Sequence, residues 1–257
     1  MKKFSVAAVA LLALSILVMG GCEKKAEKAA APAQKTKIVI ASDCTWPPME
    51  FINEAKEIVG FDVDFIRAVA EAEGFEVEIR NTAWDGIFAG LENNQYDAII
   101  SSVTITDERK KTMDFSDPYF QVNQAVVVAM TDQATARLAD LKGKAVGAQI
   151  GTTGAMEVEK DASLKLKNYD EVGLAFEDLI NGRIAAVVCD TPTAAQYALQ
   201  NEGYKNKLRV AQEIVTDEFY GIPVKKNRTE VLDLINRGIK KVKDSPKYGE
   251  LMKKWIP

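Results

Sequence analysis

Arg109 occupies a position at which a positive charge indicates an anionic ligand. The run Thr-Ile-Thr-Asp-Glu-Arg-Lys-Lys at residues 104–111 follows an apolar stretch and offers Thr106 as the N-cap of a helix. A helix N-terminus already carries positive partial charge, so a guanidinium there is unfavourable unless an anion lies between the two. A carboxylate would relieve this repulsion, because Arg109 can grip both oxygens while Thr104 and backbone N–H groups donate further hydrogen bonds. We interpret the two lysines that follow as solvated charges.

A second segment that can receive an anion is the Gly-Thr-Thr-Gly turn at residues 151–154. It follows the apolar run 145–149 and leads into a predicted helix, so it presents free backbone N–H groups. An ordinary helix start explains the same residues. The turn lacks both the Gly-Lys-Ser or Gly-Lys-Thr ending of phosphate-binding loops and the Gly-x-Gly-x-x-Gly pattern of dinucleotide-binding loops, which excludes a nucleotide loop here.

Two carboxylates and two indole rings follow predicted strands and are candidates for contact with a cation. Asp190 ends the apolar run 185–189, and Asp43 follows the first apolar run. Either carboxylate could hold an ammonium group or could cap the next helix, and the sequence leaves both interpretations open. Trp46 and Trp84 lie in loops where a ring can stack on a ligand or its cation, or pack into the core.

Histidine does not occur among the 257 residues. Its absence removes the commonest metal ligand, the commonest general base and every Ser-His-Asp or Cys-His nucleophile. The net charge is −4, and loss of Lys2 and Lys3 with a cleaved leader would take it to −6. This mildly acidic balance argues against a nucleic-acid surface. Cys44 and Cys189 could pair in an oxidising compartment or remain free, and the sequence does not decide between these states.

The elements that must position these side chains alternate between short apolar runs and amphipathic stretches, which predicts an α/β fold. Strands are expected at 38–41, 77–79, 98–101, 145–149 and 185–189, and helices at 63–72, 86–91, after Gly151, at 172–181 and at 193–201. The segments 124–130 and 218–224 resemble strands that cross between two lobes, and a last helix is predicted at 229–242. In open α/β sheets ligands lie beyond the carboxyl ends of the strands, where the candidate residues stand.

The first 36 residues predict export. Lysines precede an apolar stretch at 6–19 that is shorter than the ~20 residues of a membrane-spanning helix, and small residues follow it. Gly-Gly-Cys22 resembles the lipobox of bacterial lipoproteins, which implies cleavage before Cys22 and a lipid on its thiol. Met19 stands where that pattern prefers leucine, so ordinary cleavage remains the alternative. Residues 23–36 have the composition of a solvated linker.

Residues 37–257 resemble the polar-amino-acid solute-binding proteins of bacterial ABC importers. The segments that carry the resemblance are 43–51, 60–64, Trp84-Asp85-Gly86, 96–99, 104–117 and 151–154. The resemblance implies a type II periplasmic-binding-protein fold, in which two α/β lobes joined by two crossing strands close on a ligand by hinge motion. The expected organisation is a signal peptide at 1–21, a lipidated cysteine and flexible linker at 22–36, lobe 1 at 37–121 plus 218–257, and lobe 2 at 122–217.

The resemblance also implies a role for each candidate. Arg109 would bind the ligand's α-carboxylate with help from Thr104 and Thr153, and Ser102 and Asp190 would hold the α-ammonium. Trp46 and Trp84 would bracket the ligand side chain. Asp43 and Gln149 would determine which side chain is accepted. The predicted ligand-binding residues are Asp43, Trp46, Trp84, Ser102, Thr104, Arg109, Gln149, Thr152, Thr153 and Asp190. Cys189 departs from the polar residue that some relatives carry before the aspartate.

A basic amino acid (arginine, lysine or ornithine) is the expected ligand, with glutamine or another polar amino acid as the alternative. An acidic Asp43, two tryptophans and an uncharged Gln149 suit a cationic side chain. Residues 46–51, Trp-Pro-Pro-Met-Glu-Phe, also resemble segments of basic-amino-acid binders.

Two other classes of protein share this scaffold. Cyclohexadienyl dehydratases need only a carboxylic acid in the cleft, for which Asp43, Asp190 or Glu157 are candidates, but the clamp of Arg109 and Asp190 favours reversible binding, so we expect no enzyme. A receptor's sensory module would need a membrane span and an output domain. We therefore expect a monomeric lipoprotein in the periplasm or on the outer face of the cytoplasmic membrane. It would be anchored at Cys22 and partnered by an ABC permease complex in the inner membrane, with no cofactor, metal or nucleic acid.

Overall fold

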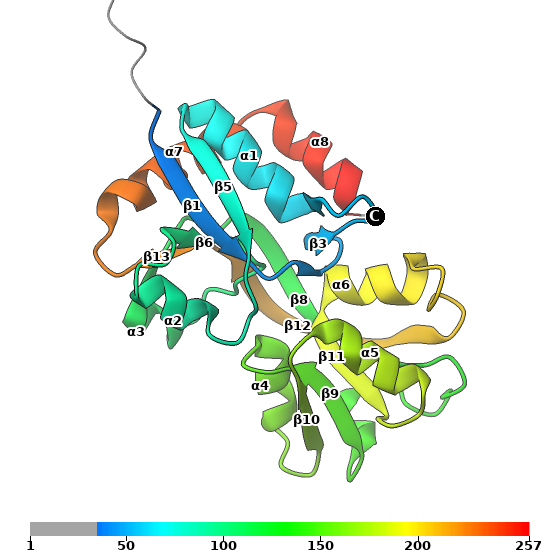
Figure 1. The fold of residues 1–257 in the computed structure, drawn as a ribbon. Helices are drawn as coiled ribbons and strands as arrows, with labels where there is room; N and C mark the ends of the chain where they lie inside the picture. The colour runs from blue at the N-terminus through cyan, green and yellow to red at the C-terminus, as the bar shows by residue number, and fades with distance from the viewer. Residues whose placement is uncertain (1–34, 257) are drawn as a thin grey trace, which may run out of the picture. The chain divides into compact units, whose positions relative to one another are not determined.

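The computed structural model describes residues 35–256, which belong to one compact unit of mixed α/β structure (Figure 1). The predicted signal peptide, Cys22 and nearly all of the predicted linker lie outside the described residues. Within 35–256, no helix combines the length and the apolar character that crossing a membrane requires.

The first sheet has the strand order β5-β1-β6-β13-β7. Its strands are β5 (Glu76–Asn81), β1 (Lys37–Ser42), β6 (Ala98–Ile99), β13 (Pro223–Lys225) and β7 (Met113–Phe115). β1 runs parallel to β5 and β6, whereas β13 is antiparallel to β6 and β7. The helices of this part are α1 (Phe61–Glu73), α2 (Ile87–Glu92), α3 (Arg109–Thr112), α7 (Thr229–Lys243) and α8 (Pro246–Trp255).

Alternation of side chains along β1 explains how helices cover both faces of this sheet. Ile38 and Ile40 are buried in a cluster with α1, α7 and α8, while Ala41 belongs to a second cluster that includes Ile87 and Leu91 of α2. Successive residues of a strand point to opposite faces, so one strand supplies both cores.

The second sheet has the strand order β10-β9-β11-β8-β12. Its strands are β10 (Lys165–Tyr169), β9 (Ala145–Gln149), β11 (Ala186–Asp190), β8 (Phe120–Ala129) and β12 (Leu208–Tyr220). The helices are α4 (Thr153–Glu159), α5 (Val172–Ile180), α6 (Thr191–Ala195), the π-helical turn Gln196–Gln200 and the 3-10 turn Leu138–Leu141. Val127 of β8 packs on the side of α5 and α6, and Val126 and Val128 pack on the side of α4.

β8 and β12 connect the two sheets. They pair antiparallel along most of their lengths, and their ends at Phe120 and Tyr220 are buried in the cluster that contains α1. An isolated bridge between Thr104 and Tyr220 adds a further link to the first sheet. Two crossing strands are therefore present, but the second begins at Leu208 and ends at Tyr220, so the expected segment 218–224 is divided between β12 and β13. The lobe boundaries at 121/122 and 217/218 remain a prediction.

Several local expectations need correction. The helix at 229–242 is not the last one, because α8 follows it and begins at Pro246 with Ser245 as its side-chain cap. A small sheet of β2 (Thr45–Trp46), β3 (Glu50–Ile52) and β4 (Ile58–Val59) was not predicted, since strands this short carry too little alternation to be recognised. β10 was missed because most of its residues are exposed or half-buried. Cys44 and Cys189 are buried and free, so they do not form a disulfide, which the sequence alone did not decide.

Candidate functional site

Eight of the ten predicted ligand-binding residues line one cavity between the two sheets. They are Trp46, Trp84, Ser102, Thr104, Arg109, Thr152, Thr153 and Asp190. The other two, Asp43 and Gln149, hydrogen-bond to each other, and Gln149 accepts a bond from Trp46. The cavity has an empty volume of about 240 Å³. Only about 10 Å³ of it can hold the centre of a water molecule, far less than the roughly 300–1,000 Å³ of most ligand pockets, so a ligand enters only if the walls separate.

Arg109 joins the two sides of the cavity. Its Nη1 donates to the Thr104 carbonyl at 2.8 Å and its Nη2 donates to the Gly151 carbonyl at 3.1 Å. The guanidinium carbon lies 5.6 Å from the Trp84 ring centre and 5.2 Å from that of Phe88. Burial lowers the pKa of Arg109 to about 10, while the charges of Asp190 and Glu218 oppose this shift. The side chain is thus a desolvated, oriented cation, as an anion site requires.

The helix that carries Arg109 is shorter than expected. Thr106 Oγ1 accepts from the Arg109 N–H at 3.1 Å, as a capping residue would, but α3 spans only Arg109–Thr112. In the second anion-binding segment, Thr152 caps α4 and its hydroxyl donates to the Gln149 carbonyl at 2.7 Å. Because the Thr152 hydroxyl is engaged in capping, Thr153 supplies the hydroxyl that faces the charged residues.

Asp190 acts as a buried hydrogen-bond acceptor and not as a helix cap. It precedes α6 but makes no side-chain capping bond. Its two oxygens accept from Gln124 Nε2 and from the Tyr220 hydroxyl. Burial raises the pKa of Asp190 to about 7, against the lowering effect of these two hydrogen bonds. A carboxyl with this pKa is readily ionised by an adjacent ammonium group.

Ser102 is held in an uncommon backbone conformation by two buried carboxyl groups that the sequence analysis missed. Its φ is 49°, in the left-handed region. Its N–H donates to Asp62 Oδ2 at 2.8 Å and its hydroxyl donates to Glu50 Oε2 at 3.1 Å. Burial raises the pKa of Asp62 to about 6 and raises that of Glu50 well above its usual value. Strain of this kind persists only where surrounding contacts impose it.

The far end of the site joins residues from both sheets. Gln149 Nε2 donates to Asp43 Oδ2 at 2.9 Å and to the Asp170 carbonyl at 2.7 Å, and Trp46 Nε1 donates to Gln149 Oε1. Trp84 Nε1 donates to the Ile150 carbonyl at 2.9 Å. Burial raises the pKa of Asp43, and the Gln149 hydrogen bond opposes the shift. Both tryptophans are also buried in apolar clusters, so each ring packs in the core and lines the cavity.

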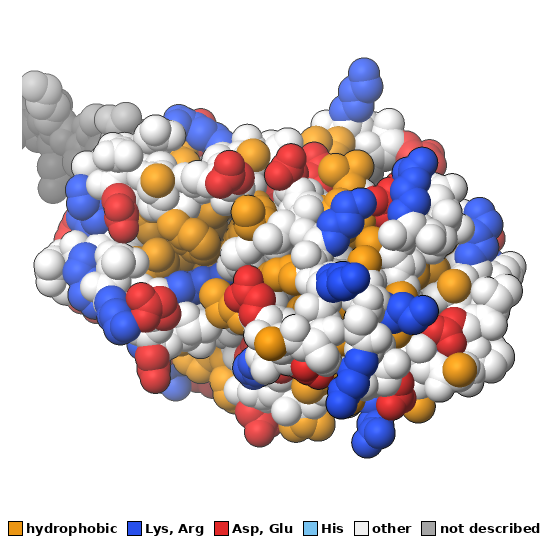
Figure 2. All heavy atoms as spheres, turned by 90° about the horizontal axis from the view of Figure 1, so that it is seen from below, with side chains coloured by type: hydrophobic (Ala, Val, Ile, Leu, Met, Phe, Trp, Pro, Cys, Tyr) orange, Lys and Arg blue, Asp and Glu red, His pale blue; other side chains and the backbone are white. Residues whose placement is uncertain are grey.

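An acidic pocket borders this end. It has an empty volume of about 600 Å³, and its lining residues are Asp43, Ala83, Trp84, Asp85, Asp170 and Glu171. All four charged residues of the lining are acidic, whereas Figure 2 shows basic and acidic side chains interspersed on the face seen from below. The local potential near Asp43 therefore favours a cation.

Gln124 and Glu218 are further polar residues of the site that the sequence analysis missed. Both lie on the crossing strands, which were used there only to divide the chain. Glu218 Oε2 accepts from Thr153 Oγ1 at 2.9 Å, from Gln124 Nε2 at 3.1 Å and from Thr104 Oγ1 at 3.3 Å. Gln124 could have been found as a polar side chain directly before the apolar run 125–128, and it is fully buried, whereas β12 is rich in polar residues and gives no such signal for Glu218.

Two other expectations concern chemistry. Within residues 35–256, no group of three or more Cys, Asp or Glu side chains is arranged to hold a metal ion. Glu157, proposed as a possible catalytic acid, pairs with Lys160 and lines a separate groove beside Arg137. It is therefore not part of the cavity.

Comparison with known proteins gives consistent matches over nearly the whole chain. The family model described as bacterial extracellular solute-binding proteins, family 3, matches residues 38–257. A probable histidine-binding protein of Neisseria gonorrhoeae is 35% identical over 261 residues, which cover 100% of this chain and 96% of the relative. ABC transporter arginine-binding protein 1 of Escherichia coli K12 is 36% identical over 227 residues, which cover 86% and 91%.

Solved structures show the same similarity. An ancestral arginine-binding protein bound to arginine superposes with a TM-score of 0.82 at 37% identity, covering 87% of this chain and 100% of that one. AncCDT-1, an ancestral amino acid-binding protein and a precursor of cyclohexadienyl dehydratase, has a TM-score of 0.77 at 30% identity, covering 86% and 95%. The two-lobe type II periplasmic-binding-protein fold is thereby confirmed.

Proposed function

This chain belongs to the bacterial extracellular solute-binding proteins of family 3, and from that premise we propose that it binds a basic amino acid between its two sheets and delivers it to an ABC permease. Arginine, lysine and ornithine are the ligands that the site favours. The relatives named as arginine- and histidine-binding proteins support an amino acid as the solute.

The observation that supports a cationic ligand is the group of acidic residues at the far end of the site. The carboxylate of Asp43 is buried beside Trp46 and Trp84, and it borders a pocket whose charged lining residues are all acidic. A guanidinium or ammonium group placed there gains a charge-assisted hydrogen bond and two aromatic faces. A neutral side chain such as that of glutamine gains only hydrogen bonds between uncharged groups or to one charged group. Glutamine therefore remains the second candidate ligand.

The opposite end provides the groups that an α-amino acid requires. Arg109 is the anion-binding cation, and the hydroxyls of Thr104 and Thr153 lie in the same hydrogen-bonded cluster. Asp190 and Ser102 are the partners of the α-ammonium. Entry and release require the two sides to separate, and β8 and β12 are the connections about which they would turn.

Reversible binding is favoured over catalysis. Asp190 in the cavity and Asp43 in the neighbouring acidic pocket each accept two side-chain hydrogen bonds and so are held as acceptors. Incubation with prephenate or arogenate, followed by an absorbance assay for the aromatic product, tests this statement. Turnover would assign the chain to the enzyme class.

The remaining parts of the proposal concern the location of the chain. Cys22 would carry the lipid that holds the protein at the outer face of the cytoplasmic membrane or in the periplasm, and the protein would act as a monomer. Labelling of cells with a radioactive fatty acid should mark the wild-type chain and not the Cys22→Ala variant. Equal labelling of both would remove the anchor from the proposal.

The decisive experiment is a thermal-shift screen of protein that has been unfolded and refolded to remove co-purified ligand. The twenty amino acids, ornithine and citrulline are the test compounds, since a ligand that binds the folded state raises the melting temperature. A selective rise with arginine, lysine or ornithine supports the proposal. A rise with glutamine alone moves the assignment to the neutral ligand, and no rise with any compound rejects amino-acid binding.

A further inference from the structure

Glu218 uses hydroxyl groups that the proposed ligand carboxylate requires. A single oxygen, Oε2, accepts from Thr153 Oγ1 at 2.9 Å and from Thr104 Oγ1 at 3.3 Å. Thr104 lies on the side of the first sheet and Thr153 begins α4 on the side of the second, so this carboxylate links the two walls of the cavity. None of the roles assigned to the site so far accounts for it.

The hydroxyls cannot serve two carboxylates at once. Each threonine hydroxyl has one proton to donate. A hydroxyl that donates to Glu218 therefore has no proton for a ligand carboxylate. Gln124 Nε2 adds a bond to Glu218 at 3.1 Å and also donates to Asp190, so the two acidic side chains share one amide.

The charges lead to the same competition. Asp190 and Glu218 both act on the single cation Arg109, since the charge of each raises its pKa. An amino acid that enters with its carboxylate toward Arg109 adds a third carboxylate to this group. Repulsion between like charges in a poorly hydrated site is relieved when one carboxylate moves away or takes up a proton, and the hydrogen bonds of Glu218 make it the group that moves.

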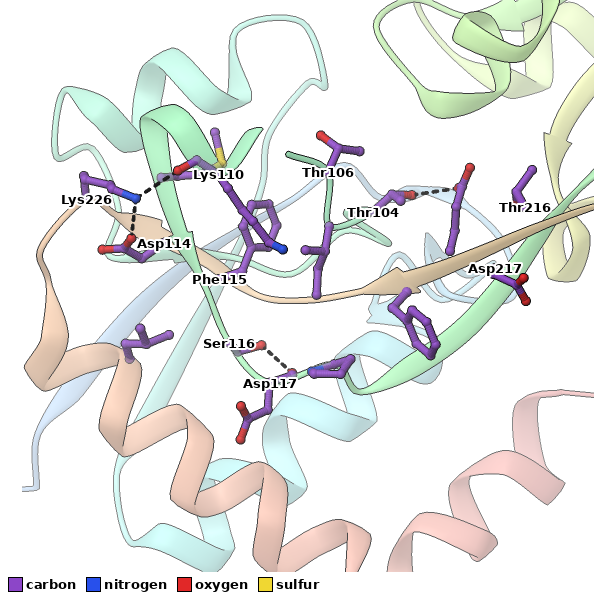
Figure 3. A pocket seen from close by; sticks show the side chains of 16 residues that line it. Thr104, Thr106, Lys110, Asp114, Phe115, Ser116, Asp117, Thr216, Asp217 and Lys226 are labelled. Atoms are coloured by element: carbon purple, nitrogen blue, oxygen red, sulfur yellow. Dashed lines mark hydrogen bonds and ion pairs between the residues drawn. The ribbon is translucent and has the colours of Figure 1, made fainter. Parts of the chain in front are cut away.

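Glu218 has space to move away from the cavity. It also lines a second, open groove with an empty volume of about 1,310 Å³, next to Thr104, Thr216 and Phe219. Figure 3 shows the Lys110 side chain at this groove, and its ammonium lies 3.9 Å from the Asp107 carboxylate. β12 is irregular at this point, with a register shift between Ile214 and Glu218 and a φ of 48° at Asp217.

We infer that Glu218 sets the affinity of the site by competing with the ligand's α-carboxylate for the hydroxyls of Thr104 and Thr153. The bound amino acid takes both hydroxyls, and the Glu218 side chain turns into the groove lined by Thr216 and Phe219. The inference rests on the proposed function, because it needs a ligand whose carboxylate faces Arg109.

Titration calorimetry of the full chain with arginine tests this competition. Glu218→Ala frees both hydroxyls, and since a hydrogen bond to a charged group contributes about 1.5–3 kcal/mol, the affinity should rise roughly tenfold or more. Glu218→Gln keeps the size of the side chain and should give a smaller rise. If Glu218→Ala folds poorly, as a thermal melt would show, Glu218→Gln alone decides whether loss of the charge raises or lowers the arginine affinity.

Matched variants separate competition from a general effect of charge. Asp217→Asn removes the same charge from the neighbouring exposed residue and should leave the arginine affinity within twofold. In a Thr153→Val background, where one contested hydroxyl is absent, the gain from Glu218→Ala should shrink.

A loss of affinity in Glu218→Ala would overturn the inference, because Glu218 would then be a partner of the ligand's ammonium. An equal gain in Asp217→Asn, or an undiminished gain in the Thr153→Val background, would also overturn it. Wild-type protein that binds no amino acid would instead reject the proposed function on which the inference rests.

Discussion

Gln149 Nε2 donates to Asp43 Oδ2 at 2.9 Å, which joins the end of β9 in the second sheet to the loop after β1 in the first. The residue that carries the negative charge and the residue that orients it therefore come from different sheets. The part of the site that is proposed to contact the ligand side chain is complete only when the two sheets are close together. Ligand selection is thus coupled to closure of the cavity.

Asp43→Asn should change which amino acid is preferred. The variant keeps the shape of the side chain but loses the charge that a guanidinium or ammonium would pair with. We expect the affinity for arginine and lysine to fall about 10- to 100-fold, because a hydrogen bond to a charged group is worth about 1.5–3 kcal/mol, while glutamine binding changes little. Calorimetric titration with the three ligands measures both effects.

The matched control for this change is Asp85→Asn. Asp85 lines the same acidic pocket but is exposed. Solvent screens an exposed charge, so its loss should reduce arginine affinity by less than about fivefold. Equal losses in the two variants would show that the general potential of the pocket, and not the Asp43 carboxylate, selects the cation.

Arg109→Ala should abolish the binding of every amino acid alike. The guanidinium is the buried cation nearest to the proposed α-carboxylate, and leaving a buried charge unpaired costs about 2–5 kcal/mol. A loss of more than about 100-fold is expected for arginine, lysine and glutamine. Lys111→Ala on the same short helix should bind normally, since Lys111 is exposed and does not line the cavity. Unchanged binding by Arg109→Ala would contradict the clamp assignment.

The affinity for an amino acid should depend on pH through Asp190. Burial raises the pKa of this carboxyl to about 7, and the ligand ammonium requires its ionised form. Affinity should therefore be constant above pH 7 and decrease as the pH falls through 7, by up to about tenfold per pH unit. Binding isotherms between pH 5 and 9 measure this dependence.

Asp190→Asn is the control for the pH effect, because Asp62, with a pKa raised to about 6, also titrates in this range. The variant should bind weakly and should lose the dependence near pH 7. A dependence that persists in Asp190→Asn would assign the titration to Asp43, Asp62 or Glu50, whose pKa values burial also raises.

Asp62→Ala should destabilise the fold and weaken binding together. The substitution leaves the Ser102 N–H and the buried Tyr119 hydroxyl without their shared acceptor. Each unpaired buried group costs about 1–3 kcal/mol, so unfolding should require roughly 2–6 kcal/mol less free energy. Urea denaturation monitored by circular dichroism measures the change. Glu71→Ala, an exposed position on the same helix, should remain within about 0.5 kcal/mol of wild type.

Much of the site could be predicted because local patterns carry the relevant information. The continuous apolar runs at 38–41 and 145–149 correspond to β1 and β9. The rule that ligands lie beyond the carboxyl ends of strands selected most of the residues that line the cavity. The absence of histidine excludes most hydrolytic mechanisms by composition alone, because those mechanisms need an imidazole as the general base.

The sequence by itself determined most of the longer strands and helices and the polar side chains that stand at their ends, but not the short strands, β10 or α8. Only the tertiary structure decided what those side chains bind. Asp190 could equally have capped α6. Instead, its carboxylate accepts hydrogen bonds from Gln124 and Tyr220, which lie on two other strands. Glu50 and Glu218 carry no local signal for their roles. The pairing of a buried polar group depends on elements far away in the chain, and these meet only when the core has formed.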